Sequence, residues 1–134
     1  MEREEVSIFN DSLERCNKNP DFLEDFYKLF IASSNEISEK FKNTDLKKQK
    51  RMLKASLFML VLANEGKLEG LEHLKKIAES HNRQNLDIKP ELYKIWLECL
   101  IKTVEKFDRK FDSKIENVWR TTMETGINFM TSRY

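Results

Sequence analysis

His81 closes a predicted amphipathic helix on its apolar side, where an imidazole needs either a buried hydrogen bond or a metal. Three other residues stand on or near other expected helices and complete the set: Tyr27, Phe41 and Gln49. Together they predict a closed apolar pocket, with one nitrogen ligand on one wall and two hydrogen-bonding groups, a phenol and a carboxamide, on the other. This is binding chemistry at a metal, not hydrolysis.

Each of these residues also has a simpler interpretation. His81 could bond the last carbonyls of its helix, and the Tyr27 hydroxyl could reach solvent or a backbone carbonyl. Gln49 could be a surface glutamine among lysines, and Phe41 could be plain core. We favour the pocket because Tyr27 lies in the most apolar segment of the chain, where its hydroxyl must find a partner. Gln49 also occupies a turn of an apolar stripe where leucine would be expected.

The helices that must position these residues follow from apolar periodicity and from capping signals. The chain of 134 residues is long enough for one domain, 1–134, and its few Gly and Pro favour helix. We expect six or seven helices of uneven length, packed obliquely around a pocket. Their approximate ranges are 4–16, 20–33, 36–41, 45–64, a helix ending near 81, 90–107 and 112–130, with a polar loop at 82–88.

Composition excludes several function classes. The net charge of +1 gives no support for nucleic-acid binding, and the longest apolar run, 57–63, is too short to span a membrane. The charged start, Met-Glu-Arg-Glu-Glu, lacks the apolar core of a signal peptide, so we expect a cytoplasmic protein. Cys16 and Cys99 both fall on apolar stripes and are expected to be buried free thiols. No zinc, phosphate-loop or Ser/His/Asp motif appears.

The ordered set of motifs resembles a single-domain bacterial globin over nearly the whole chain. Residues 26–30, Phe-Tyr-Lys-Leu-Phe, are similar to the signature of the second globin helix, and Phe41 follows Tyr27 by fourteen residues. Gln49 with Leu53 is similar to the distal pair, and residues 77–81 to the end of the proximal helix. Residues 89–93 resemble the start of the next helix, and Trp119 resembles the tryptophan of the last helix.

The resemblance implies an all-α globin fold that binds haem b. His81 would be the proximal iron ligand, Phe41 would stack on the porphyrin, and Gln49 would replace the distal histidine of other globins, facing a bound gas together with Tyr27. We expect the Ser80 hydroxyl and the Ile77 carbonyl to support the second ring nitrogen of His81. The candidate haem wall comprises Leu53, Phe58, Ile77, Ile88, Tyr93 and Leu97, each equally explicable as core.

Two further expectations concern basic residues. His73 is the only other histidine and lies more than two helical turns before His81, so both cannot easily ligate one iron; we expect His73 to be solvent-exposed. One basic residue near the mouth could pair with a haem propionate. The sequence leaves the choice open among Lys48, Lys50, Arg51 and Arg83.

Three functions stay open at this point. The first is reversible binding of dioxygen, carbon monoxide or nitric oxide at a five-coordinate iron, with oxygen transport as the associated role. The second is a nitric oxide dioxygenase that depends on an external reductase, since the glutamate of flavohaemoglobin-type globins would fall at or near Tyr134. The third is a cofactor-free globin-fold sensor or interaction module. We favour the first.

Overall fold

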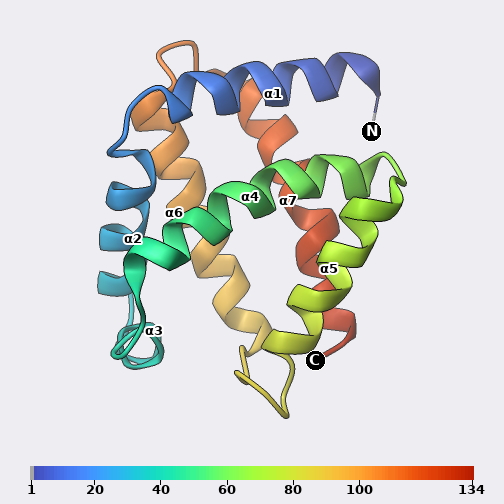
Figure 1. The fold of residues 1–134 in the computed structure, drawn as a ribbon. Coiled ribbons are helices and arrows are strands. Elements are labelled where there is room, and N and C mark those ends of the chain that lie inside the picture. The colour runs from blue at the N-terminus through green and yellow to red at the C-terminus, as the bar shows by residue number, and fades with distance from the viewer. Residues whose placement is uncertain (1) are drawn as a thin grey trace.

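The computed structural model describes residues 2–134 and contains seven α-helices within them (Figure 1). The helices are α1 (Arg3–Asn17), α2 (Phe22–Ala32), α3 (Asn35–Lys40), α4 (Leu46–Asn64), α5 (Leu68–His81), α6 (Pro90–Phe107) and α7 (Ser113–Ser132). No strand occurs in this part of the chain, so the all-α expectation is confirmed. Each helix matches an expected range to within two residues; the largest shifts are at the start of α2, which begins at Phe22 and not at Pro20, and at the end of α7, which reaches Ser132 and not Met130.

The helix ends are set by short polar side chains. Ser34, Asp45 and Asp112 cap the first turns of α3, α4 and α7, where their side-chain oxygens accept hydrogen bonds from backbone N–H groups. Pro90 begins α6, where its missing N–H costs nothing. Gly66, with φ +75°, ends α4 in the left-handed conformation that glycine adopts without strain.

The helices cross at steep angles around a common core. In Figure 1, α4 crosses in front of α6, α1 runs above them, and α5 descends from the end of α4. Trp119, Phe9 and Leu100 are fully buried at the centre. Their burial removes apolar surface from water, which is the main term that holds such a domain together.

A buried cluster of polar side chains connects α1 to Asp108, the residue that follows α6, and to Trp119 in the second turn of α7. Asp108 accepts hydrogen bonds from Ser12 Oγ at 2.6 Å and from Arg15 Nε at 2.6 Å. Ser12 in turn accepts a bond from Trp119 Nε1 at 2.8 Å. Burial alone raises the pKa of Asp108, but its donors, Arg15, Ser12 and the Lys110 N–H, outweigh burial and lower the pKa below its usual range.

Two expectations about the chain at large can be checked here. Cys16 and Cys99 are buried free thiols, as predicted, and burial raises the pKa of Cys16 to about 12. Among residues 2–134, no helix has the length and apolar character that crossing a membrane requires.

Candidate functional site

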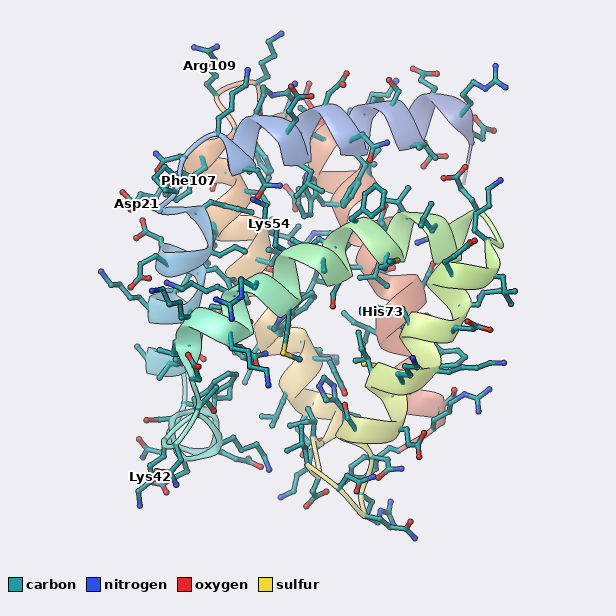
Figure 2. All side chains as sticks on the ribbon, viewed as in Figure 1. Asp21, Lys42, Lys54, His73, Phe107 and Arg109 are labelled. Carbon is teal, nitrogen blue, oxygen red and sulfur yellow. The ribbon has the colours of Figure 1, made fainter. Side chains whose placement is uncertain are left out.

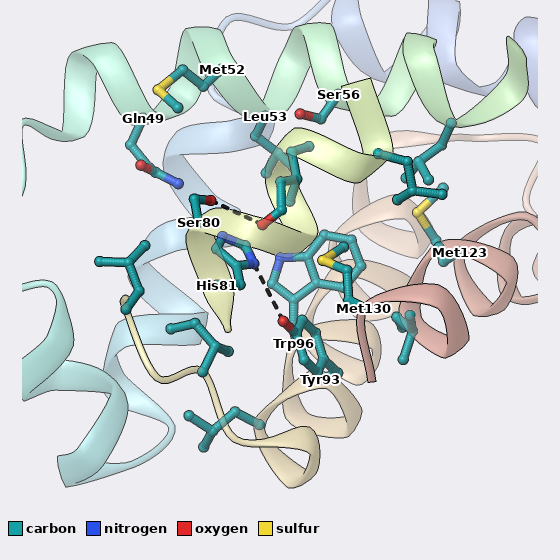
Figure 3. A pocket seen from close by; sticks show the side chains of 18 of the residues that line it. Gln49, Met52, Leu53, Ser56, Ser80, His81, Tyr93, Trp96, Met123 and Met130 are labelled. Atoms are coloured by element: carbon teal, nitrogen blue, oxygen red, sulfur yellow. Dashed lines mark hydrogen bonds between the residues drawn. The ribbon is translucent and has the colours of Figure 1, made fainter. Parts of the chain in front are cut away.

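A cavity of about 590 Å³ lies between α4 and α5, with α2, α3, α6 and α7 as its other walls. Its volume is within the usual range for a small-molecule or cofactor site. Its lining is mostly apolar, and it brings together Tyr27, Phe41, Gln49 and His81 as predicted. Figure 3 shows Gln49 and Leu53 reaching in from α4, with His81 opposite at the end of α5.

The cavity exists because α4 and α5 touch at one end and separate at the other. A Cβ placed on Gly70 would lie 2.3 Å from Ala63 N and 2.7 Å from Met59 O, so the two helix backbones meet where only glycine fits. From this contact the helices diverge, as Figure 1 shows. The space between them therefore opens toward Gln49 and His81.

His81 is held by a residue from the next helix. Its Nδ1 lies 3.3 Å from the Tyr93 hydroxyl, which is the bond drawn between the two rings in Figure 3. The expected support from Ser80 is not what the structure contains: the Ser80 hydroxyl donates to the Ile77 carbonyl at 2.9 Å. The Ser80 hydroxyl bonds to a carbonyl of its own helix, one turn back. The Tyr93 hydroxyl of α6 therefore takes the role that was predicted for Ser80.

The other ring nitrogen of His81 is left for a ligand. Within residues 2–134, every fully enclosed side-chain nitrogen or oxygen has a hydrogen-bond partner. Since the hydrogen bond of the His81 ring is at Nδ1, its Nε2 is not enclosed, and His81 is one of the residues that line the cavity. Burial lowers the pKa of His81, which keeps the ring neutral and able to offer a lone pair.

The opposite wall carries the predicted pair of hydrogen-bonding groups. Tyr27 is only 4% exposed, and its ring lies 5.0 Å from that of Phe26 and 5.8 Å from that of Phe41, centroid to centroid. Burial raises the pKa of Tyr27 to about 12, and a side-chain hydrogen bond with Gln49 partly offsets this. The phenol therefore stays protonated and can act as a donor.

Four of the six residues proposed as haem wall line the cavity. Leu53, Ile77, Ile88 and Tyr93 line the cavity with Phe41. Two predicted members do not belong to it. Phe58 is 55% exposed on the outer side of α4, one position beyond the apolar stripe at Leu57, and Leu97 is buried in the core away from the cavity.

Other lining residues were not predicted as part of the site. Trp96 lines the cavity from α6, one turn beyond Tyr93. All four methionines of the described chain, Met52, Met59, Met123 and Met130, also line it. Flexible thioether side chains adapt to the outline of a bound molecule, which suits a cavity of this kind.

His73 corrects a specific expectation. It lines the cavity instead of facing solvent, and its Nε2 lies 2.9 Å from Ser56 Oγ of α4. Figure 2 shows it between α4 and α5. Burial, and to a smaller extent the nearby charge of Lys76, lower the pKa of His73. The pair forms a polar link between the two helices near their close contact at Gly70.

The basic residue at the edge of the cavity is not one of the four that the sequence suggested for pairing with a propionate. Lys40 is the one lysine or arginine that lines the cavity among the described residues, and its Nζ donates to the Leu86 carbonyl at 3.2 Å. Lys50 pairs with Glu24, and the guanidinium of Arg83 lies 4.7 Å above the Tyr134 ring. Neither these two nor Lys48 and Arg51 reach the cavity wall.

The residues present fit a flat apolar cofactor with a metal at its centre. A neutral imidazole offers Nε2 from one wall, an aromatic ring at Phe41 lies at the side, and donors stand opposite. A group with carboxylate arms would meet Lys40 at the rim. The residues present therefore fit the needs of a haem, which are a nitrogen ligand and an apolar enclosure.

Comparison with known proteins agrees with this geometry. The chain matches the globin family over residues 24–130. Among solved structures it is similar to PA3967 from Pseudomonas aeruginosa PAO1, described as structurally highly homologous to a human hemoglobin, at 37% identity and a TM-score of 0.92. That match covers 97% of this chain and 98% of the other. No curated protein matches. On the family match and this structural likeness, the chain belongs to the globin family.

Proposed function

We propose that this globin binds haem b through His81 and uses it to bind dioxygen, or another small gas, reversibly. Membership of the family implies a haem cofactor, and haem supplies, when bound, an iron with an open coordination position. The observation that carries the proposal is the His81 ring, with Nδ1 engaged by Tyr93 and Nε2 bordering the cavity.

Tyr93 would fix the tautomer that the proposed function needs. When Nε2 serves as a metal ligand, the ring proton resides on Nδ1, where it donates to the Tyr93 hydroxyl oxygen. Burial raises the pKa of Tyr93 to about 12, so the phenol stays neutral and the imidazole is not drawn toward an anion. Tyr93 is therefore a positioning residue in this proposal.

Tyr27 and Gln49 would hold the gas on the opposite side. Both residues line the apolar cavity, where a hydrogen bond to a partially negative oxygen atom is stronger than in water. Dioxygen acquires such charge on binding more than carbon monoxide does. The pair therefore favours dioxygen and slows its release.

The second imidazole in the cavity does not compete for the metal. His73 lies eight residues before His81 on the same helix, a separation of about 12 Å along the axis. Its Nε2 is already engaged by Ser56. We therefore expect a five-coordinate ferrous state in the absence of gas.

Absorption spectra of the purified protein test the proposal. The wild type should show a Soret band, a five-coordinate ferrous spectrum after dithionite, and reversible shifts with dioxygen and carbon monoxide. His81→Ala should lose the band or bind haem far more weakly, and His73→Ala, the matched control on the same helix, should keep it. An unchanged Soret band in His81→Ala would contradict the assignment.

A further inference from the structure

A second hollow, of about 320 Å³, lies outside the cavity between α2, α3 and α4. Tyr27 lines this hollow and also lines the main cavity. Among the described residues, Tyr27 is the one residue that lines both spaces. The hollow therefore meets the main cavity at Tyr27, the residue proposed to face the gas ligand.

The walls of the hollow suit a small apolar molecule. Ile31, Ala32 and Leu46 contribute apolar surface, and the small side chains of Ala32 and Ser38 leave room. An ion pair between Glu24 of α2 and Lys50 of α4 lies at the rim, with both side chains partly exposed. This ion pair links α2 to α4 beside the hollow, and the apolar residues named above form the rest of its wall.

The main opening is poorly placed for gas once a cofactor is present. A porphyrin in the cavity would occupy the cleft between α4 and α5, and Lys40 spans the rim to the Leu86 carbonyl. Gas that arrives there would have to pass a bound cofactor. The hollow leads instead directly to Tyr27, on the side opposite His81.

We propose that diatomic gas reaches its binding position through the hollow between α2 and α4, passing the Tyr27 ring, and not through the cleft between α4 and α5. This rests on the proposed haem function. The ring contacts of Tyr27 with Phe26 and Phe41 keep it in place at rest, so passage requires the ring to move.

Carbon monoxide rebinding after flash photolysis tests the route. Ala32→Trp fills the hollow at an exposed position and should slow bimolecular association several-fold, with little change in the Soret band. Ala55→Trp is the matched control, because Ala55 is an exposed alanine of α4 that lines neither space. Ala55→Trp should leave the association rate nearly unchanged.

The outcomes separate this inference from the proposed function. A normal Soret band with unchanged association in Ala32→Trp, or equal slowing in Ala55→Trp, overturns the route and leaves haem binding intact. Absence of haem binding in the wild type overturns both. Xenon gives a readout that is independent of iron: under xenon pressure, the methyl NMR signals of Ile31 and Leu46 should shift in the wild type and not in Ala32→Trp. Failure of those shifts would also contradict the route.

Discussion

Replacement of Tyr27 by phenylalanine isolates the role of one hydroxyl group. The ring is 4% exposed and packed against Phe26 and Phe41, so phenylalanine keeps the same apolar contacts and removes only the oxygen. A hydrogen bond to a partially charged acceptor in such a site is worth about 1.5 kcal/mol. Since about 1.4 kcal/mol corresponds to a factor of ten, dioxygen should leave Tyr27→Phe roughly tenfold faster.

Stopped-flow mixing of the dioxygen complex with carbon monoxide measures this release rate. Carbon monoxide release is the internal control: it should change much less, because that ligand develops less negative charge. Tyr27 and Gln49 also form a hydrogen bond with each other, so their contributions need not add. Gln49→Leu and the double variant complete a double-mutant cycle that separates the two contributions. An unchanged dioxygen release rate in Tyr27→Phe, with an intact Soret band, would refute the assigned role of the phenol.

The remaining predictions concern stability. Asp108→Asn should lower the free energy of unfolding by about 3 kcal/mol, since Arg15 loses a buried carboxylate, whereas Glu98→Gln, at an exposed Arg120 pair, should cost about 1 kcal/mol or less; urea denaturation measures both. The pKa of Asp108 is lower in the folded state, so its contribution to stability is present above pH 3.8 and is lost as the pH falls through the folded-state pKa. In Asp108→Asn, the free energy of unfolding should therefore fall less steeply as the pH is lowered. An unchanged pH dependence in the acidic range would contradict this. Gly70→Ala should lower the free energy of unfolding by about 1–3 kcal/mol and speed haem loss, because its Cβ meets the α4 backbone. Gly126→Ala should lower the free energy of unfolding less, because its Cβ meets only the end of the Leu60 side chain. Equal losses of stability in the two variants would refute the comparison.

The sequence was informative where a polar residue interrupts an apolar stripe. Gln49, Tyr27 and His81 each occupy a position that periodicity assigns to the interior, and a buried polar group needs a partner or a ligand. Their convergence on one cavity was therefore predictable once the helix order was known. The resemblance to globins supplied that order, which periodicity alone does not give.

The spacing of residues within one helix did not predict their contacts with residues of other helices. The partner of His81 comes from α6, and spacing within α5 suggested only Ser80 and Ile77. Lys40 reaches the rim because α3 packs beside the 82–89 loop, a placement that no local signal specifies. Phe58 was misassigned because the stripe of α4 passes through Leu57, and one residue further along a helix turns the side chain about 100° away.

His73 is a different case, because the sequence did carry the signal. His73, Ile77 and His81 are spaced i, i+4 and i+8, so all three lie on one face of α5, and Ser56 lies on the facing stripe of α4 seven residues after Gln49. Both histidines therefore had to face the cavity, and position alone does not decide which one is the ligand. The hydrogen bonds favour His81 in the proposed role: Ser56 occupies Nε2 of His73, whereas Tyr93 takes Nδ1 of His81 and leaves its Nε2 without a protein partner. A ring held at Nδ1 can coordinate a metal through Nε2 without losing its partner, and His73 would have to give up Ser56 to do so.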